Sequence, residues 1–240
     1  MAQFKTYTAR LVRSTSLSEW TRHLEFEMQG VTNFGFVPGQ WLSVKHILAN
    51  GEELIRPYSM ASAPTENGSF AFCLNRVSEG HMSNFLCDMQ PGAEISCQGP
   101  FGNFILHPPP RDTVFIATGT GIAPIRSMLH WLLADQARHL DKQFWLLFGS
   151  RTKRDIYYHD EFVELAAKHA NFHYMPTLSR GSDGWPGLRG YVQEHVKEVV
   201  GERKDMHAYI CGLAKMVKAN RDLLSGMGWD RKSILYERYD

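Results

Sequence analysis

Residues 113–124 read TVFIATGTGIAP, and this stretch decides the fold of the second half of the chain. Its first six residues form a short apolar run of the kind found in strands that are buried on both faces of a parallel sheet. Gly119 and Gly121 follow, and then Pro124, which suits the first turn of a helix. A strand, a glycine turn and a helix in this order predict the start of a doubly wound α/β domain.

The remainder of the second half alternates between the same two kinds of element. We expect further strands over residues 143–148, 172–178, 208–211 and 233–236, and helices over 124–137, 159–169, 191–199 and 214–225. Such alternation predicts a parallel sheet covered on both faces, with ligands at the carboxyl ends of the strands. Gly119, Gly149, Ser179 and Gly212 all fall at these expected ends.

The first half of the chain, residues 1–106, has a different pattern. Short apolar or alternating runs cover residues 7–13, 23–28, 40–46, 69–77 and 93–98, and turn residues such as Pro38-Gly39 separate them. This pattern indicates an antiparallel barrel or a sandwich. The proline-rich segment 107–112 favours neither strand nor helix, so we place two domains at 1–108 and 109–240.

One short helix is expected within the first half, over residues 83–88. Gly80, His81 and Met82 provide a flexible turn before it, and Ser83 is a suitable N-cap residue. A helix amino terminus presents free amides and the positive end of a dipole, so this segment could bind an anion.

The composition is that of an ordinary globular protein, with 43% hydrophobic and 21% charged residues in 240. A net charge of +1 points to neither nucleic acid nor membrane as a partner. The amino terminus lacks the apolar core of a signal peptide, and no apolar run approaches the roughly 20 residues of a membrane span. We therefore expect a cytoplasmic protein.

The four cysteines, Cys73, Cys87, Cys97 and Cys211, do not form a C-x-x-C pair or the spacing of an iron–sulfur ligand set. We expect neither a metal centre nor a disulfide. The first three are expected to be small buried apolar residues.

A second informative stretch is Arg56-Pro57-Tyr58-Ser59. Arginine suits a phosphate, tyrosine can stack on a ring system, and a serine hydroxyl can bond a ring nitrogen that changes protonation. The alternative is an edge strand that ends in a turn. Tyr58 and Ser59 would point to opposite faces of a regular strand, so both can contact one ring only if the strand ends or twists there.

The glycine turn of residues 119–124 allows a pyrophosphate to approach closely, although an ordinary strand-to-helix turn is the alternative. The acidic residue that often binds an adenosine ribose at the end of the second strand is absent, and Gly149-Ser150-Arg151 stands there instead. Both stretches in one chain indicate an enzyme that passes a hydride between a nicotinamide and a flavin.

Together the motifs resemble those of the ferredoxin–NADP reductase family, the flavin reductases of plants and bacteria. The resemblance is carried by RPYS (56–59), GHMSNFLCD (80–88), PGAE (91–94), GPFG (99–102), GTGIAP (119–124), CGL (211–213) and ERY (237–239). They follow the family's order through nearly the whole chain.

The resemblance implies an N-terminal antiparallel β-barrel that binds FAD and a C-terminal doubly wound α/β domain that binds NADP or NAD. Arg56 is then expected at the flavin pyrophosphate, Tyr58 on one face of the isoalloxazine and Ser59 near its N5 atom. The remaining FAD contacts are expected at Pro57, Cys73, Asn75, Val77, Gly80, His81, Met82, Ser83 and Tyr239.

The resemblance also implies a coenzyme site and a catalytic centre. Coenzyme contacts are expected at Gly119, Thr120, Gly121, Pro124, Ser150, Arg151, Ser179, Arg180, Arg189, Tyr191, Cys211, Gly212 and Met216. Ser59, Cys211, Glu237 and Tyr239 are the expected catalytic residues, with Tyr239 on the flavin face opposite Tyr58.

Ser179, Arg180, Arg189 and Tyr191 are suitable partners for a 2′-phosphate, an arrangement that resembles the NADP-using members. The alternative is a basic, solvated loop, and Asp183 would repel a phosphate if it pointed inward. Asp240 follows the tyrosine that ends the plant enzymes, and its role stays open.

Three functions remain compatible with these residues. The first is an NADPH-dependent reductase of a separate ferredoxin or flavodoxin. We expect such a reductase to be a monomer that binds neither nucleic acid nor a membrane. The second is the NADH-dependent reductase component of an oxygenase system. The third is a non-catalytic flavin-binding electron-transfer subunit.

Overall fold

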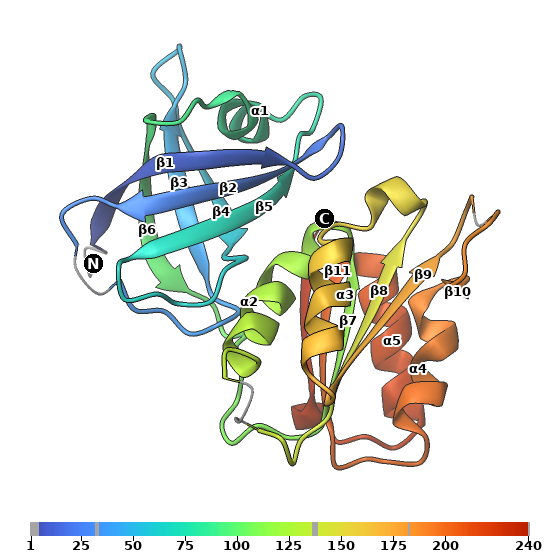
Figure 1. The fold of residues 1–240 in the computed structure, drawn as a ribbon. Coiled ribbons are helices and arrows are strands. Elements are labelled where there is room, and N and C mark those ends of the chain that lie inside the picture. The colour runs from blue at the N-terminus through green and yellow to red at the C-terminus, as the bar shows by residue number, and fades with distance from the viewer. Residues whose placement is uncertain (1–4, 32–33, 136–138, 182, 240) are drawn as a thin grey trace. The chain divides into compact units, whose positions relative to one another are not determined.

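The computed structural model describes residues 5–31, 34–135, 139–181 and 183–239 (Figure 1). The chain divides into two compact units. The first comprises Met1–Leu106 with Arg126–Trp131, and the second comprises His107–Ile125 with Leu132–Asp240.

Six antiparallel strands form the first unit: β1 (Thr6–Ser16), β2 (Thr21–Met28), β3 (Trp41–Ile47), β4 (Glu53–Ser59), β5 (Ser69–Asn75) and β6 (Glu94–Phe101). Their order is β4-β3-β6-β1-β2-β5. A bridge between Met60, directly after β4, and Phe72 on β5 joins the two outer strands. The expected antiparallel architecture is confirmed, and it is the barrel rather than the sandwich.

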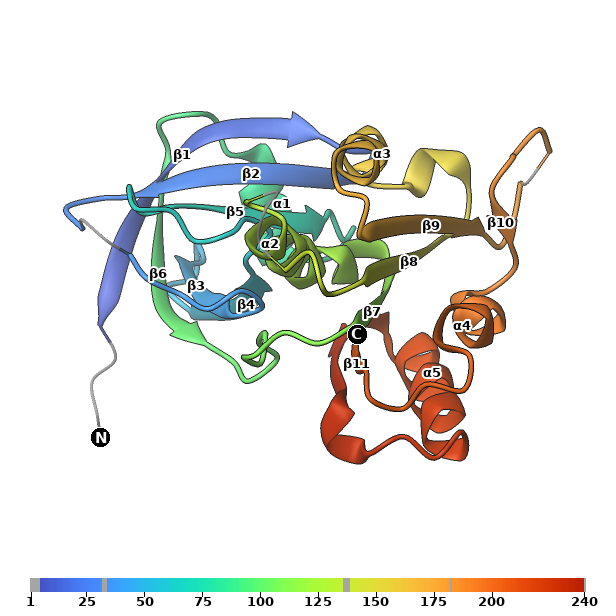
Figure 2. The same ribbon diagram turned by 60° about the horizontal axis from the view of Figure 1, so that its bottom comes forward.

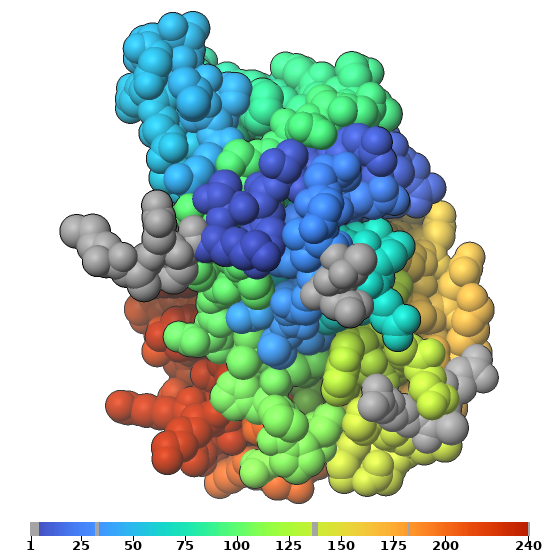
Figure 3. Space-filling view, turned by 90° about the vertical axis from the view of Figure 1, so that its left-hand side faces the viewer, coloured from blue at the N-terminus to red at the C-terminus, as the bar shows by residue number. Residues whose placement is uncertain are grey.

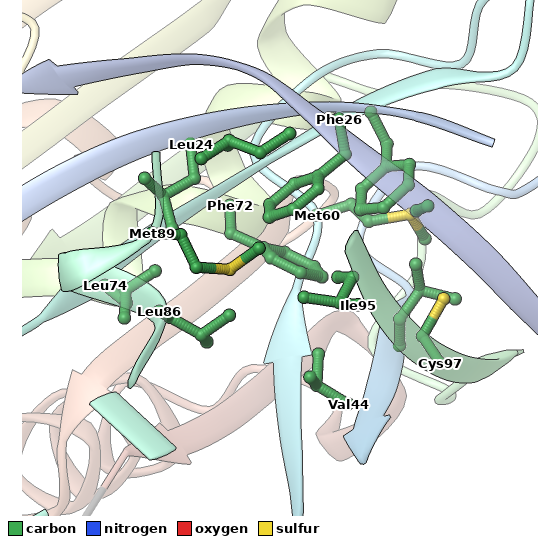
Figure 4. Packing of buried hydrophobic residues seen from close by; sticks show 14 of the residues in the cluster. Leu24, Phe26, Val44, Met60, Phe72, Leu74, Leu86, Met89, Ile95 and Cys97 are labelled. Carbon is green, nitrogen blue, oxygen red and sulfur yellow. The ribbon is translucent and has the colours of Figure 1, made fainter. Parts of the chain in front are cut away.

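The barrel interior is filled by apolar side chains that alternate along the strands (Figure 4). Phe26 of β2 stacks on Phe70 of β5 with ring centroids 5.4 Å apart, and Phe72 lies against both. Each side chain of this size contributes about 1.5–3 kcal/mol when it is fully buried. Cys97 is part of the same cluster, as expected for a small apolar residue.

The hairpin between β3 and β4 projects from the barrel surface (Figure 3). A Lys45–Glu53 ion pair at 3.5 Å joins its two strands. On the other face of the hairpin, His46 stacks on Phe85 of helix α1 (His81–Asp88), with ring centroids 3.8 Å apart. The hairpin therefore fixes α1 against the barrel.

The helix predicted over residues 83–88 begins two residues earlier, at His81. Gly80 is the N-cap residue, and the prediction that Ser83 caps the helix is wrong. The Ser83 hydroxyl lies inside the first turn, where it donates to the Gly80 carbonyl and accepts from the Val77 N–H. Ser83 thus holds the turn before the helix rather than starting the helix.

The second unit is built on a six-stranded parallel sheet in the order β10-β9-β8-β7-β11-β12. The strands are β7 (Thr113–Thr118), β8 (Phe144–Ser150), β9 (Phe172–Leu178), β10 (Leu188–Arg189), β11 (His207–Leu213) and β12 (Ile234–Tyr239). The sequence predicted five strands and missed β10, because two residues are too few to show a pattern. The predicted α/β architecture is confirmed.

Among the described residues, four helices and three short 3₁₀ turns connect these strands. They are η1 (Gly119–Gly121), α2 (Ile122–Leu132), η2 (Lys153–Asp155), α3 (His159–Lys168), α4 (Val192–Val200), α5 (Ala214–Gly226) and η3 (Arg231–Ser233). Helices α4 and α5 lie on one face of the sheet and α3 on the other (Figure 2). The helix predicted over residues 124–137 corresponds to α2, which ends at Leu132. The predicted last residue, 137, lies outside the described residues.

Residues 107–112 form neither helix nor strand, as their prolines predicted. The His107 N–H donates to the Tyr209 hydroxyl at 2.9 Å, which attaches the start of this segment to β11. All four cysteines are buried and free of disulfides. No helix among the described residues is long and apolar enough to cross a membrane.

Candidate functional site

The first group of predicted site residues lies at the end of β4. The strand ends at Ser59, and Met60 then turns to pair with Phe72. This meets the condition under which Tyr58 and Ser59 could both contact one ligand. Ser59 is 8% exposed, whereas Pro57 and Arg56 are exposed.

Tyr58 packs against the barrel core, with its ring centroid 5.6 Å from that of Phe72. Burial raises the pKa of Tyr58 to about 12, and the nearby Cys87 acts in the same direction. The phenol is therefore neutral at physiological pH. It offers a fixed, half-buried aromatic ring with an uncharged hydroxyl.

Arg56 provides an available positive charge. Its guanidinium donates to the carbonyl of the neighbouring Ile55 at 2.8 Å, and it forms no ion pair with any described residue. A guanidinium in this state can bind a phosphate without first breaking an internal ion pair.

The turn of residues 76–80 is held in place by α1. Asn84 donates to the carbonyls of Val77 and Ser78, and the Arg76 guanidinium bonds both Asn84 and Asp88. Arg76 and Asp88 were not among the predicted site residues, because their role appears only when the turn and the helix are seen together.

The amino terminus of α1 is open. It has no side-chain cap and no acidic residue in its first turn. The backbone N–H groups of His81, Met82 and Ser83 have no acceptor among the described residues, and the first helical hydrogen bond is from Asn84 to Gly80. These amides suit an anion such as a pyrophosphate.

The other predicted flavin contacts, on β5, in the turn after it and on α1, differ in their surroundings. Cys73 is 5% exposed, and Asn75 accepts a hydrogen bond from the Thr21 hydroxyl at 2.7 Å. Val77 is 56% exposed, whereas the Met82 side chain belongs to the barrel core. Met82 can therefore contribute its amide to a site but not its side chain.

In the second unit, the two glycines of the 119–124 turn have different roles. Gly119 has φ of +56° with open space around it, so its backbone can be approached by a ligand. Gly121 packs directly against the Cys211 carbonyl, where a Cβ would overlap it. Gly121 is therefore required by packing within the fold.

The end of β11 is held by Thr118, the last residue of β7. The Thr118 hydroxyl accepts from the Leu213 N–H at 3.3 Å, and a Cβ on Gly212 would overlap Thr118. Gly212 also has φ of +139°. Thr118 was not among the predicted site residues, although its position directly before the glycine turn was a usable signal.

The structure brings three of the predicted catalytic residues together. Cys211 pairs with Glu237 across β11 and β12, and Tyr239 lies within hydrogen-bonding reach of the thiol. Burial raises the pKa of Cys211 well above its ordinary value, and the Glu237 carboxylate acts in the same direction. The thiol is neutral, so it is suited to packing rather than to nucleophilic attack.

Three predicted arginines lie at the carboxyl ends of neighbouring strands. The Arg180 N–H donates to the Arg151 carbonyl at 2.9 Å, and Arg189 pairs with Leu178 at the end of β9. All three are exposed, and none forms an ion pair among the described residues. This edge of the sheet therefore carries three unneutralised positive charges.

The remaining predicted coenzyme contacts lie in or near the segments that follow the strands. Thr120 lies in η1, and Pro124 is buried in the first turn of α2. Ser150 donates to the Asp155 carbonyl, and Ser179 to that of Ser150. Tyr191 is 61% exposed as the N-cap residue of α4.

Met216 is 8% exposed and belongs to the core cluster under α4 and α5. Its side chain therefore packs within the fold, and its contact with the coenzyme stays a prediction. Asp240, whose role the sequence left open, lies outside the described residues.

The residues in both units fit the nucleotides that the motifs predicted. The first unit combines open helix amides, an unpaired guanidinium and a fixed aromatic ring, which suit the pyrophosphate and the ring of FAD. The second combines an open glycine turn with three free arginines, which suit a phosphorylated nicotinamide nucleotide.

Comparisons with known proteins agree with this interpretation. The family model for an oxidoreductase FAD-binding domain matches residues 8–105, and the model for an oxidoreductase NAD-binding domain matches residues 115–222. The protein is 42% identical over 249 aligned residues to ferredoxin–NADP reductase B of Sorangium cellulosum (strain So ce56), with 100% of each chain covered.

More distant similarities are also found. The glycine betaine monooxygenase reductase subunit of Chromohalobacter salexigens is 30% identical over 82% of this chain, which spans only 54% of that relative. The structure of a ferredoxin NADP+ reductase from Neisseria gonorrhoeae, with bound FAD and NADP, superposes with a TM-score of 0.83 at 21% identity, covering 98% and 99% of the two chains. This last similarity concerns the fold alone.

Two nucleotide sites with the expected donors and a full-length relative at 42% identity lead to one conclusion. The chain belongs to the ferredoxin–NADP reductase family and is an oxidoreductase with FAD and a nicotinamide nucleotide as its cofactors.

Proposed function

We propose that the protein moves a hydride between NADPH and FAD and exchanges single electrons with a separate carrier, a ferredoxin or a flavodoxin. The observation that carries the coenzyme part is the trio of unpaired arginines at the carboxyl ends of β8, β9 and β10. The 42% identity to a ferredoxin–NADP reductase over the full chain supports the carrier part.

In the first unit, the chain's own residues would bind and orient the flavin. The amides that begin α1 and the Arg56 guanidinium would hold the pyrophosphate, while the Tyr58 ring would support one face of the isoalloxazine. Bound FAD would supply the chemistry that accepts a hydride and releases electrons one at a time. Ser59 would orient the ring edge near N5 by hydrogen bonding.

In the second unit, the turn from Gly119 would receive the coenzyme pyrophosphate. Cys211 and Glu237 would orient the nicotinamide, with the neutral thiol as a packing surface and the carboxylate as an electrostatic partner. Hydride transfer needs the reacting atoms about 3–3.5 Å apart rather than a strong acid or base. Tyr239 lies against Cys211, so a nicotinamide that reaches this thiol would displace it.

Arg180 and Arg189, with Ser179 and Tyr191, would bind the 2′-phosphate of NADPH. Arg180→Ala should therefore reduce kcat/KM for NADPH by about tenfold or more and leave that for NADH nearly unchanged, since a charge-assisted contact contributes about 1.5–3 kcal/mol. Arg231→Ala is the matched control, because Arg231 is exposed in η3, before β12, at the opposite end of the strands.

Equal kcat/KM values for NADPH and NADH in the unmodified protein would contradict the coenzyme assignment. Reduction of purified ferredoxin and flavodoxin by NADPH tests the carrier. Failure with both carriers, together with a preference for NADH, would favour an oxygenase reductase component. We also propose domains at 1–108 and 109–240, a monomeric state and a cytoplasmic location.

A further inference from the structure

The segment between Arg180 and Arg189 is rich in glycine. Gly181, Gly184 and Gly190 have φ values of +56°, +70° and +95°. A segment of this composition has a large conformational entropy unless something anchors it. Hydrogen bonds to the ends of β8 and β9 fix its two ends, whereas its centre needs a separate anchor.

Trp185 anchors the centre of the segment. Its side chain is 8% exposed, although its neighbours Gly184 and Pro186 are exposed. The indole N–H donates to the Leu188 carbonyl at 2.9 Å, and the ring lies 5.9 Å from that of His159 at the start of α3.

This contact is part of a wider cluster. The Nδ1 atom of His159 is 3.2 Å from the Tyr174 hydroxyl on β9, and the Tyr174 ring packs on Phe162 of α3. A Cβ on Gly187 would lie 2.7 Å from the Trp185 ring. The indole thus ties the segment to α3 and β9, and Gly187 leaves the space that it occupies.

The same segment carries an acidic residue. Asp183 is exposed, and it is separated from Trp185 by one residue and from Arg180 by two. Among the residues that the structure describes, Asp183 forms no ion pair with Arg180 or Arg189. The arginines remain unneutralised although a carboxylate lies in the segment that connects them.

We propose that Trp185 is a positioning residue for coenzyme selectivity: its anchored indole keeps the Asp183 carboxylate away from Arg180 and Arg189, which leaves both guanidinium groups for a 2′-phosphate. This proposal rests on the proposed function, because it takes the arginines as the 2′-phosphate site. Without the anchor, the glycines would let Asp183 reach an arginine and compete with the phosphate.

The test compares Trp185→Ala with the double variant Trp185→Ala/Asp183→Asn. Trp185→Ala should raise KM for NADPH about two- to fivefold, the effect of one exposed ion pair, with kcat and the NADH constants unchanged. Adding Asp183→Asn should restore the original KM for NADPH. Inhibition by adenosine 2′,5′-bisphosphate should be weaker in Trp185→Ala and should return to its original strength in the double variant. Inhibition by adenosine 5′-monophosphate should be the same in all three proteins.

Gly187→Ala is an independent variant, because its Cβ displaces the indole without removing it. If Trp185→Ala does not fold, Gly187→Ala takes its place in the test. Trp185→Phe keeps an aromatic ring in the cluster and should retain most of the NADPH selectivity. The proposal is overturned if the anchor variants raise KM for both coenzymes equally, or if Asp183→Asn does not restore KM for NADPH.

The arginine variants distinguish this proposal from the proposed function. If Arg180→Ala and Arg189→Ala leave the ratio of kcat/KM for NADPH and NADH unchanged, the 2′-phosphate site itself is misplaced. If they change the ratio while Trp185→Ala and Gly187→Ala do not, only the role of Trp185 is wrong.

Discussion

Gly121 lies directly against the main-chain carbonyl of Cys211, so the glycine turn after β7 and the end of β11 form one packed unit. The two residues are far apart in sequence, yet no side chain larger than hydrogen fits between them. The position of Cys211 therefore depends on the glycine turn, which links the coenzyme-binding segment to the expected catalytic segment.

Gly121→Ala should displace the end of β11, because the new Cβ would overlap backbone atoms that cannot move aside freely. We expect a loss of about 1–3 kcal/mol of stability and slower flavin reduction by NADPH, with an unchanged FAD content. Stopped-flow absorbance and thermal unfolding measure the two effects.

Gly30→Ala, in the turn after β2 of the first unit, is the matched control for that variant. It meets open space but places a Cβ at φ of +65°, which costs about 1–2 kcal/mol without moving β11. Equal reduction rates in both glycine variants would show that the contact between Gly121 and Cys211 does not control the reaction.

Arg56→Ala should weaken FAD binding by about 2 kcal/mol, because the variant loses a charge-assisted contact with the pyrophosphate. The measurement is the flavin content after purification and a titration of the apoprotein with FAD. Arg13→Ala, which removes another exposed barrel arginine that is paired with Glu25, should retain its flavin. A full flavin complement in Arg56→Ala would rule out the pyrophosphate role.

Cys211→Ser should slow hydride transfer while the flavin content stays intact, because the thiol is expected to pack beside the nicotinamide. Burial raises the pKa of Cys211 well above its ordinary value of 9.0, so the thiol remains protonated throughout the physiological range. The rate of flavin reduction should then show no inflection from this thiol below pH 9. If flavin in the serine variant is reduced as fast as in the unmodified protein, Cys211 has only a structural role.

His207 should make the protein less stable in acid. Burial lowers its pKa below the ordinary value of 6.5, and Arg111 and His107 add to the shift. Below pH 6.5 the unfolded chain binds a proton that the folded protein resists, so the free energy of unfolding falls as the pH falls through this range.

His207→Gln removes this titration and should reduce the drop in melting temperature between pH 7.5 and pH 5.5. Thermal unfolding of both proteins at the two pH values measures the difference. If the melting temperature of the variant falls by the same amount, groups other than His207 cause the acid sensitivity.

The amino-acid sequence by itself determined the two architectures and the order of their motifs. Alternating runs separated by turn pairs specify antiparallel strands, and a buried strand followed by Gly119, Gly121 and Pro124 specifies a parallel α/β unit. These signals are local, because the spacing of apolar residues and the backbone preferences of glycine and proline act within one element.

Only the tertiary structure decided which partner each polar or small residue meets. It showed that Ser83 bonds the turn before α1, that Gly121 packs on Cys211 and that Trp185 anchors the segment between two arginines. It also added β10, whose two residues pair only because β9 lies beside them. Contacts of this kind join residues that are distant in sequence, and their energies arise only after the chain has brought those residues together, so no local pattern encodes them.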